Sequence, residues 1–126
     1  MNRRIMVGLV AVSLVGLVVF SVMGTSVAEL ERLATRELVP EIQLAAGIAL
    51  GRHYAEVKTL AEMEALAVEG VTPGLRLAAQ IALEHLFVAT EKTMGELIAI
   101  AETGATVELR RAALPALNRF LVVVDP

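Results

Sequence analysis

Three segments of this 126-residue sequence are near copies of one another. Residues 39–53 read VPEIQLAAGIALGRH, residues 72–86 read TPGLRLAAQIALEHL, and residues 106–120 read TVELRRAALPALNRF. The copies start 33 and 34 residues apart, and a fixed period of this length is typical of chains built from repeated helical units. The constraint on the fold is strong, because each unit must pack against its own copies.

The first half of each repeat begins with the same short signal. SVAE, TLAE and TMGE each place a hydroxyl residue three positions before a glutamate. In such a capping box the two side chains bond to backbone N–H groups at the start of a helix. We therefore expect helices with capping boxes at Ser26, Thr59 and Thr93. The second and third of these helices should end at Gly70 and Gly104, with the glycines in the left-handed conformation.

The second half of each repeat predicts a longer, more apolar helix. Thr72 and Thr106 are expected N-caps, whereas Val39 takes their place in the first copy. Apolar residues cover well over half of the helix circumference, and this is more than a surface helix needs. A helix buried by its hairpin partner and by both neighbouring units needs that much. The sequence therefore predicts an all-α fold with three helical hairpins, in repeats 25–57, 58–91 and 92–126.

The residues of the second helix resemble short HEAT repeats of the type related to phycobilisome lyase repeats. The resemblance rests on two matching sets: Leu75, Arg76, Ala78, Ala79, Ala82 and Leu83; and Leu109, Arg110, Ala112, Ala113, Ala116 and Leu117. In the first copy Ile42 and Gln43 replace the Leu-Arg pair. The resemblance implies an α-solenoid whose second helices line a concave surface for a partner. It does not carry the lyase activity of some relatives to this chain.

Residues 1–24 predict a signal peptide or a membrane-anchor helix. Arg3 and Arg4 precede an apolar run, residues 5–23, that would span about 28 Å as a helix. A small-residue cleavage site at residues 22–24 or 26–28 fits a signal peptide, whereas the length of the run fits an anchor. Either interpretation places residues 25–126 in the bacterial periplasm or at the outer face of the inner membrane.

The composition excludes several classes of function. The chain has no cysteine, so disulfides and thiolate catalysis are excluded. After Gly24 there are nine basic and fourteen acidic residues, the opposite of a nucleic-acid-binding footprint. No serine follows Ser26 and no aspartate precedes Asp125, so a Ser/His/Asp site is absent. We therefore expect no enzymatic activity, no cofactor, no metal site and no nucleic-acid partner.

Polar side chains on the second helices are confined to one strip, which we predict to bind an unknown protein or peptide. The strip comprises Gln43, Arg76, Gln80, Glu84, Arg110 and Asn118. The predicted function is a non-catalytic extracytoplasmic scaffold, joined to the membrane if the N-terminal helix is uncleaved. Two alternatives stay open: an accessory subunit of an enzyme or of a pigment- or cofactor-handling system, and a self-stacking structural unit.

Three smaller features also need an assignment. His53 and His85 are not spaced as a metal pair on one helix, so we interpret His53 as partly buried and His85 as a residue of a last helical turn. Pro115 interrupts the last apolar segment and should kink its helix. The apolar end at residues 121–124 should fold back over the last repeat, or else pair with another chain.

Overall fold

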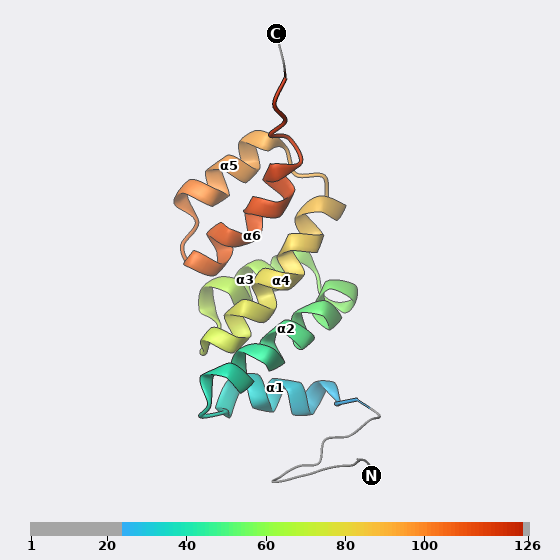
Figure 1. Cartoon of the computed structure of the whole chain (residues 1–126), viewed down its shortest axis with the longest axis vertical. Helices are drawn as coiled ribbons and strands as arrows, with labels where there is room; N and C mark the ends of the chain where they lie inside the picture. Colours follow the sequence, from blue (N-terminus) through green and yellow to red (C-terminus); the bar gives the residue numbers. More distant parts are fainter. Residues whose placement is uncertain (1–23, 125–126) are drawn as a thin grey trace.

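The protein is all-α, with six helices and no strand in residues 24–124, which are the residues that our computed structural model describes. The apolar run at residues 5–23, predicted to be a signal peptide or an anchor, lies outside the described residues. The helices follow one another as short and long members of three hairpins (Figure 1). They are α1 (Val27–Arg36), α2 (Pro40–Val57), α3 (Leu60–Glu69), α4 (Pro73–Ala89), α5 (Met94–Thr103) and α6 (Val107–Asn118).

Packing between the hairpins depends on the second helix of each. Helix α4 contacts α2 on one side and α6 on the other, besides its own hairpin partner α3. The short helices α1, α3 and α5 make no contact with one another. Each instead reaches one long helix of the following hairpin, α1 with α4 and α3 with α6. The hairpins therefore form a row along the long axis of the molecule, with α4 at its centre (Figure 1).

The predicted caps begin the short helices, but only two of the three capping boxes are complete. At Thr59 and Thr93 the hydroxyl accepts from the backbone N–H of the glutamate, and the glutamate accepts in return. These bonds hold the pKa values of Glu62 and Glu96 below the usual carboxyl value. At Ser26 the hydroxyl caps α1, but the Glu29 carboxylate pairs with Arg32 instead. The prediction of a third box was therefore wrong in its second half.

Gly70 and Gly104 end α3 and α5 as predicted, but not in the left-handed conformation. Both have φ of -56°, which any residue can adopt. Space is tight there, because a Cβ on either residue would lie 2.7 Å from the carbonyl oxygen of Leu66 or Ile100 and 3.0 Å from the Cγ of an arginine on the following helix. That arginine is Arg76 for Gly70 and Arg110 for Gly104. The turns after α3 and α5 are therefore closely packed, and neither contains a residue with a positive φ at its glycine. Glu37 nevertheless takes a similar conformation at the equivalent position of the first hairpin.

The core between the hairpins is made of small residues. Four of the paired alanines, Ala78, Ala79, Ala112 and Ala113, are 0% exposed. A Cβ on Gly51 would lie 2.5 Å from the Cβ of Ile81, so α2 and α4 approach closely at this point. Close packing at such contacts leaves no room for an added methyl group. Phe87, Leu50, Leu83 and Leu97 are the largest fully buried side chains among the described residues.

At each junction between hairpins, one threonine bonds to the preceding hairpin. The Thr72 hydroxyl accepts from the N–H of Leu75 as the predicted N-cap, and it also donates to the carbonyl of Ala34, at 2.7 Å. Thr106 repeats this arrangement one hairpin later, and it donates to the carbonyl of Ala67 at 2.8 Å. Val39 stands at the equivalent position of the first hairpin, where it makes no side-chain cap. The same residue type therefore starts a helix and joins two hairpins.

The chain after α6 does not fold back over the last hairpin. Residues 121–124 are extended and exposed, and they lead away from the other helices (Figure 1). The expected return over the last repeat was therefore wrong. The reason is geometric, since the turn at residues 119–120 carries the chain out along the axis of the row. Pro115 lies inside α6, which continues for three residues beyond it.

Replacing Gly51 with alanine tests the close packing of α2 and α4. The new methyl group would lie 2.7 Å from the backbone carbonyl oxygen of Ala78, and backbone cannot move aside cheaply. We expect Gly51→Ala to lower the free energy of unfolding by about 1–3 kcal/mol, measured by urea denaturation. Gly95→Ala is the matched control, because a Cβ there meets nothing within 4 Å. That variant should be neutral or stabilising by about 0.5–1 kcal/mol, and equal losses in both variants would contradict the packing.

Candidate functional site: the long helices and the cleft at the third hairpin

The strip predicted to bind a partner lies largely between hairpins. Gln43 accepts a hydrogen bond from the backbone N–H of Gly74 at 3.2 Å, across the contact of α2 with α4. Its amide nitrogen also lies 3.4 Å from the carbonyl oxygen of Glu37, in the turn before α2. Gln43 therefore holds two segments of the protein together, and only part of its side chain is accessible.

Arg76 and Arg110 hold equivalent turns. The Arg76 guanidinium donates to the carbonyl of Gly70, and Arg110 donates to the carbonyl of Gly104, both at 2.9 Å. Arg76 also reaches Glu108 at the start of α6, at 3.3 Å, with both side chains largely shielded from water. The two arginines therefore stabilise the fold through these contacts, which is sufficient to explain why arginine recurs at this repeat position.

The other three strip residues are less constrained. Gln80 and Glu84 lie one turn apart on α4, half-buried, and Gln80 donates to the Glu84 carboxylate at 3.2 Å. Asn118 is exposed at the end of α6. Gly47 and Gly51 occupy the positions of Gln80 and Glu84 in the first repeat. The contact of α2 with α4 therefore has small residues at these two positions, and the contact of α4 with α6 has larger ones.

A second surface of the long helices is more accessible than the predicted strip. Leu44, Leu77 and Arg111 occupy one repeat position, two residues before Ala46, Ala79 and Ala113 and therefore about 160° around the helix from these buried alanines. Leu44 and Ile48 on α2 are 40% and 38% exposed. We define the inner-helix surface by its six residues: Leu44, Ile48, Leu77, Ile81, Arg111 and Pro115. The helical phase of the sequence places these residues together on one side, but the prediction of a binding strip rests on polar residues and therefore misses this surface.

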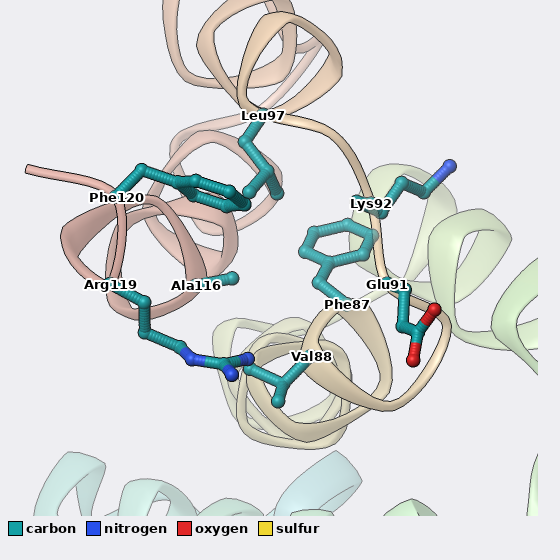
Figure 2. Close-up of a pocket in the computed structure, with 8 residues that line it drawn as sticks. All are labelled: Phe87, Val88, Glu91, Lys92, Leu97, Ala116, Arg119 and Phe120. Atoms are coloured by element: carbon teal, nitrogen blue, oxygen red, sulfur yellow. The ribbon is translucent and has the colours of Figure 1, made fainter.

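The cleft beside α4 contains a cavity of about 360 Å³. It lies between the C-terminal ends of α4 and α6 and the start of α5 (Figure 2). The buried side chains of Phe87, Leu97 and Ala116 line it, and the Lys92 ammonium lies 5.9 Å from the centre of the Phe87 ring. Figure 2 shows the Arg119 guanidinium beside Val88, on the other side of Phe87 from Lys92. The cavity therefore has apolar side chains inside, and the charged residues Glu91, Lys92 and Arg119 stand at its edge.

The first hairpin has a tyrosine at the position of Phe87. Tyr54 stands at the repeat position of Phe87, and its hydroxyl donates to the Glu31 carboxylate on α1. Burial, together with the carboxylate, raises the pKa of Tyr54 well above its usual value, so the hydroxyl stays protonated and donating. This bond joins the two helices of the first hairpin, and no comparable bond is made by Phe87.

The two histidines do not form a site. His53 is half-buried, as predicted, with its ring 6.4 Å from that of Tyr54. His85 is exposed in α4, with Nδ1 3.2 Å from the carbonyl oxygen of Ile81. In the part of the chain that the structure describes, no three potential metal ligands of the His, Cys, Asp or Glu type gather at one place.

None of the six helices combines the length and apolar character that crossing a membrane requires, a finding restricted to residues 24–124. No protein-family model, curated protein or solved structure matches this chain.

Replacing Arg76 tests its structural role. Arg76→Met keeps much of the apolar stem but leaves the Gly70 carbonyl and the Glu108 carboxylate without this donor. We expect a loss of about 1–3 kcal/mol in the free energy of unfolding, because buried polar groups are costly to leave unpaired. Arg52→Met, at an exposed arginine on α2, should change it by less than about 0.5 kcal/mol. If both variants are equally stable, Arg76 is free to serve a partner instead.

Proposed function

We propose that this protein is a non-catalytic extracytoplasmic interaction module, a short α-solenoid of three HEAT-like hairpins that binds a protein or peptide. The inner-helix surface would make the contact, with Gln80, Glu84 and Asn118 along its edge. Residues 1–24 would direct the chain to the periplasm or anchor it at the outer face of the inner membrane. The observation that carries the proposal is the exposure of Leu44 and Ile48 on α2, a helix that packs against α1 and α4.

The solenoid assignment is supported by contacts that recur at the repeat interval. The hydrogen bond from Thr72 to Ala34 is repeated by the bond from Thr106 to Ala67. The acceptors are 33 residues apart and the donors are 34 residues apart. Leu75 and Leu109 pack half-buried against the core at the same repeat position, whereas Ile42 is 43% exposed in the first hairpin of the described residues. Recurring contacts between neighbouring units, with atypical terminal units, are characteristic of solenoids.

The partner would combine apolar side chains with at least one acidic group. Leu44 and Leu77 offer apolar contact, and Arg111 stands at the same repeat position on α6, exposed. No salt bridge to Arg111 occurs within the described residues. An amphipathic segment lying across the three long helices would bury the leucines and pair a carboxylate with Arg111. Helical grooves commonly bind peptides in this manner.

Two substitutions to glutamate on this surface test the proposal. Leu44→Glu with Arg111→Glu alters two exposed positions, so the melting temperature should change little. Capture of partners from the native envelope by crosslinking and quantitative mass spectrometry should fall by at least about 30-fold, the loss expected from a contact worth about 2 kcal/mol. Val68→Glu with Arg36→Glu is the matched control, with exposed residues on α3 and α1. Undiminished capture by the first variant would exclude this surface.

A second candidate function is suggested by the cavity lined by Phe87, Leu97 and Ala116. Its apolar interior, with Lys92 and Arg119 against a single carboxylate, Glu91, fits a small amphipathic molecule with an acidic group, as in an accessory role in cofactor or pigment handling. Val88→Trp should fill the cavity and abolish any bound small molecule seen by native mass spectrometry. A clean mass for the unaltered chain, purified gently, would exclude this function.

A further inference from the structure

Helix α2 has a face that is covered on the other two long helices. Ala45 is exposed, although Ala78 and Ala112 at the same repeat position are 0% exposed. Ala49 is partly accessible, whereas Ala82 and Ala116 are buried. In α4 this face packs against α2, and in α6 it packs against α4. The exposed face of α2 is therefore a docking surface shaped for a preceding long helix of the same kind.

The other end of the row has the complementary gap. Leu114 on α6 is 50% exposed, whereas Gly47 at its repeat position on α2 is buried against α4. Ala101 on α5 is half-buried, although Ala34 and Ala67 at the same position are 0% exposed beneath the following hairpin. The end formed by α5 and α6 thus offers the side of a hairpin that normally receives the next one.

We propose that copies of this chain associate head to tail, with the α6 end of one copy packed on the α2 face of a second copy. Charge complementarity identifies the occupant. Arg76 pairs with Glu108, and the same repeat positions at the two ends are filled by Arg110 and Glu41. Arg110 of one copy would therefore meet Glu41 of the second copy as Arg76 meets Glu108 within the chain. Both end residues are accessible, and neither has a salt bridge within the described residues.

The junction between copies is weaker than the contacts within the chain. Thr72 and Thr106 donate to the preceding hairpin, but Val39 stands at their position on the first hairpin and has no hydroxyl to give to Ala101. Leu114 also holds the helices further apart than Gly47 does. Association is therefore reversible and depends on concentration. Because the two contacting surfaces differ, it is heterologous and extends into an open row unless the rotation closes a ring.

A charge placed on the α2 face tests the association. Ala45→Arg is tolerated by a single copy, because the position is exposed, but it cannot be buried as Ala78 and Ala112 are. The full chain in a neutral detergent should gain mass with concentration in sedimentation velocity. In Ala45→Arg this association should weaken by at least about tenfold. Ala65→Arg, at an exposed alanine on α3, is the matched control and should associate as the unaltered chain does.

Two results of that experiment would overturn the proposal. One is an unaltered chain that stays a single copy throughout the concentration series, and the other is undiminished association of Ala45→Arg. A single-copy chain whose melting temperature is lowered by Ala45→Arg would show that another segment or partner covers this face.

Exchanging the paired charges separates the proposed junction from other modes of association. Glu41→Arg places two cations opposite each other and should weaken association, whereas adding Arg110→Glu restores an opposite pair and should recover it. The comparison is between the single and the double variant, so a loss of stability from Arg110→Glu alone cannot imitate recovery. An additive loss in the double variant would contradict the pairing.

Crosslinking locates the contact directly, because the chain has no cysteine of its own. Gly51 and Ile81 touch within the chain, and the same repeat positions at the junction are Asn118 and Ile48. A mixture of Asn118→Cys chains and Ile48→Cys chains should form the mixed dimer with a short bismaleimide. Each variant alone should form much less. Equal yields in all three samples would show random collision and would overturn the proposed arrangement.

Discussion

The close approach of the long helices is the contact on which the rest of the structure depends. It is possible because the facing residues are small: Gly47 and Gly51 on α2, Gly74 and Ala78 on α4. The short helices make no contact with one another, and α1 and α3 make only small contacts with the long helix of the following hairpin. A Cβ on Gly47 or Gly51 would press against the backbone of α4, so a larger side chain there would force the two helices to shift. The bonds from Thr72 and Gln43 join the same two hairpins. Small residues and polar ties thus act together.

The residues at the helix contacts differ between the α2–α4 contact and the α4–α6 contact. Gly47 and Gly51 bring α2 onto α4, whereas Gln80 and Glu84 stand at these positions where α4 meets α6. A cavity lies beside Phe87 at the second of these contacts, whereas Tyr54, at the repeat position of Phe87, bonds to Glu31 within the first hairpin.

Much of the fold could be predicted from the sequence, because helix ends and buried faces follow local rules. Ser26, Thr59, Thr72, Thr93 and Thr106 cap their helices as the hydroxyl pattern predicts. The extended conformation at Gly70 was not predicted, because a glycine at a helix end commonly takes the left-handed conformation, whereas Glu37 and Gly70 both lead directly into the next helix. Likewise, the path of residues 121–124 depends on tertiary contacts that no local pattern encodes.

The candidate site was harder to predict, because polar residues on a helical repeat serve two purposes. Gln43, Arg76 and Arg110 resemble a partner-binding strip in the sequence, yet their side chains tie turns and neighbouring helices. Only the three-dimensional arrangement distinguishes such ties from free groups. The exposed apolar positions Leu44 and Ile48 were visible in the helical phase, but apolar residues are more often core than surface, and the sequence alone favoured that interpretation.

Native-state hydrogen exchange tests most directly whether the hairpins stand only by mutual packing. Helix α4 is the helix with neighbours on both sides, so its amides from Ala79 to Phe87 should be the slowest to exchange. Protection should fall toward α1 and α5, and the variant Gly51→Ala should weaken α2 and α4 together. Independent opening of each hairpin, with α2, α4 and α6 equally protected and α4 insensitive to Gly51→Ala, would contradict the account.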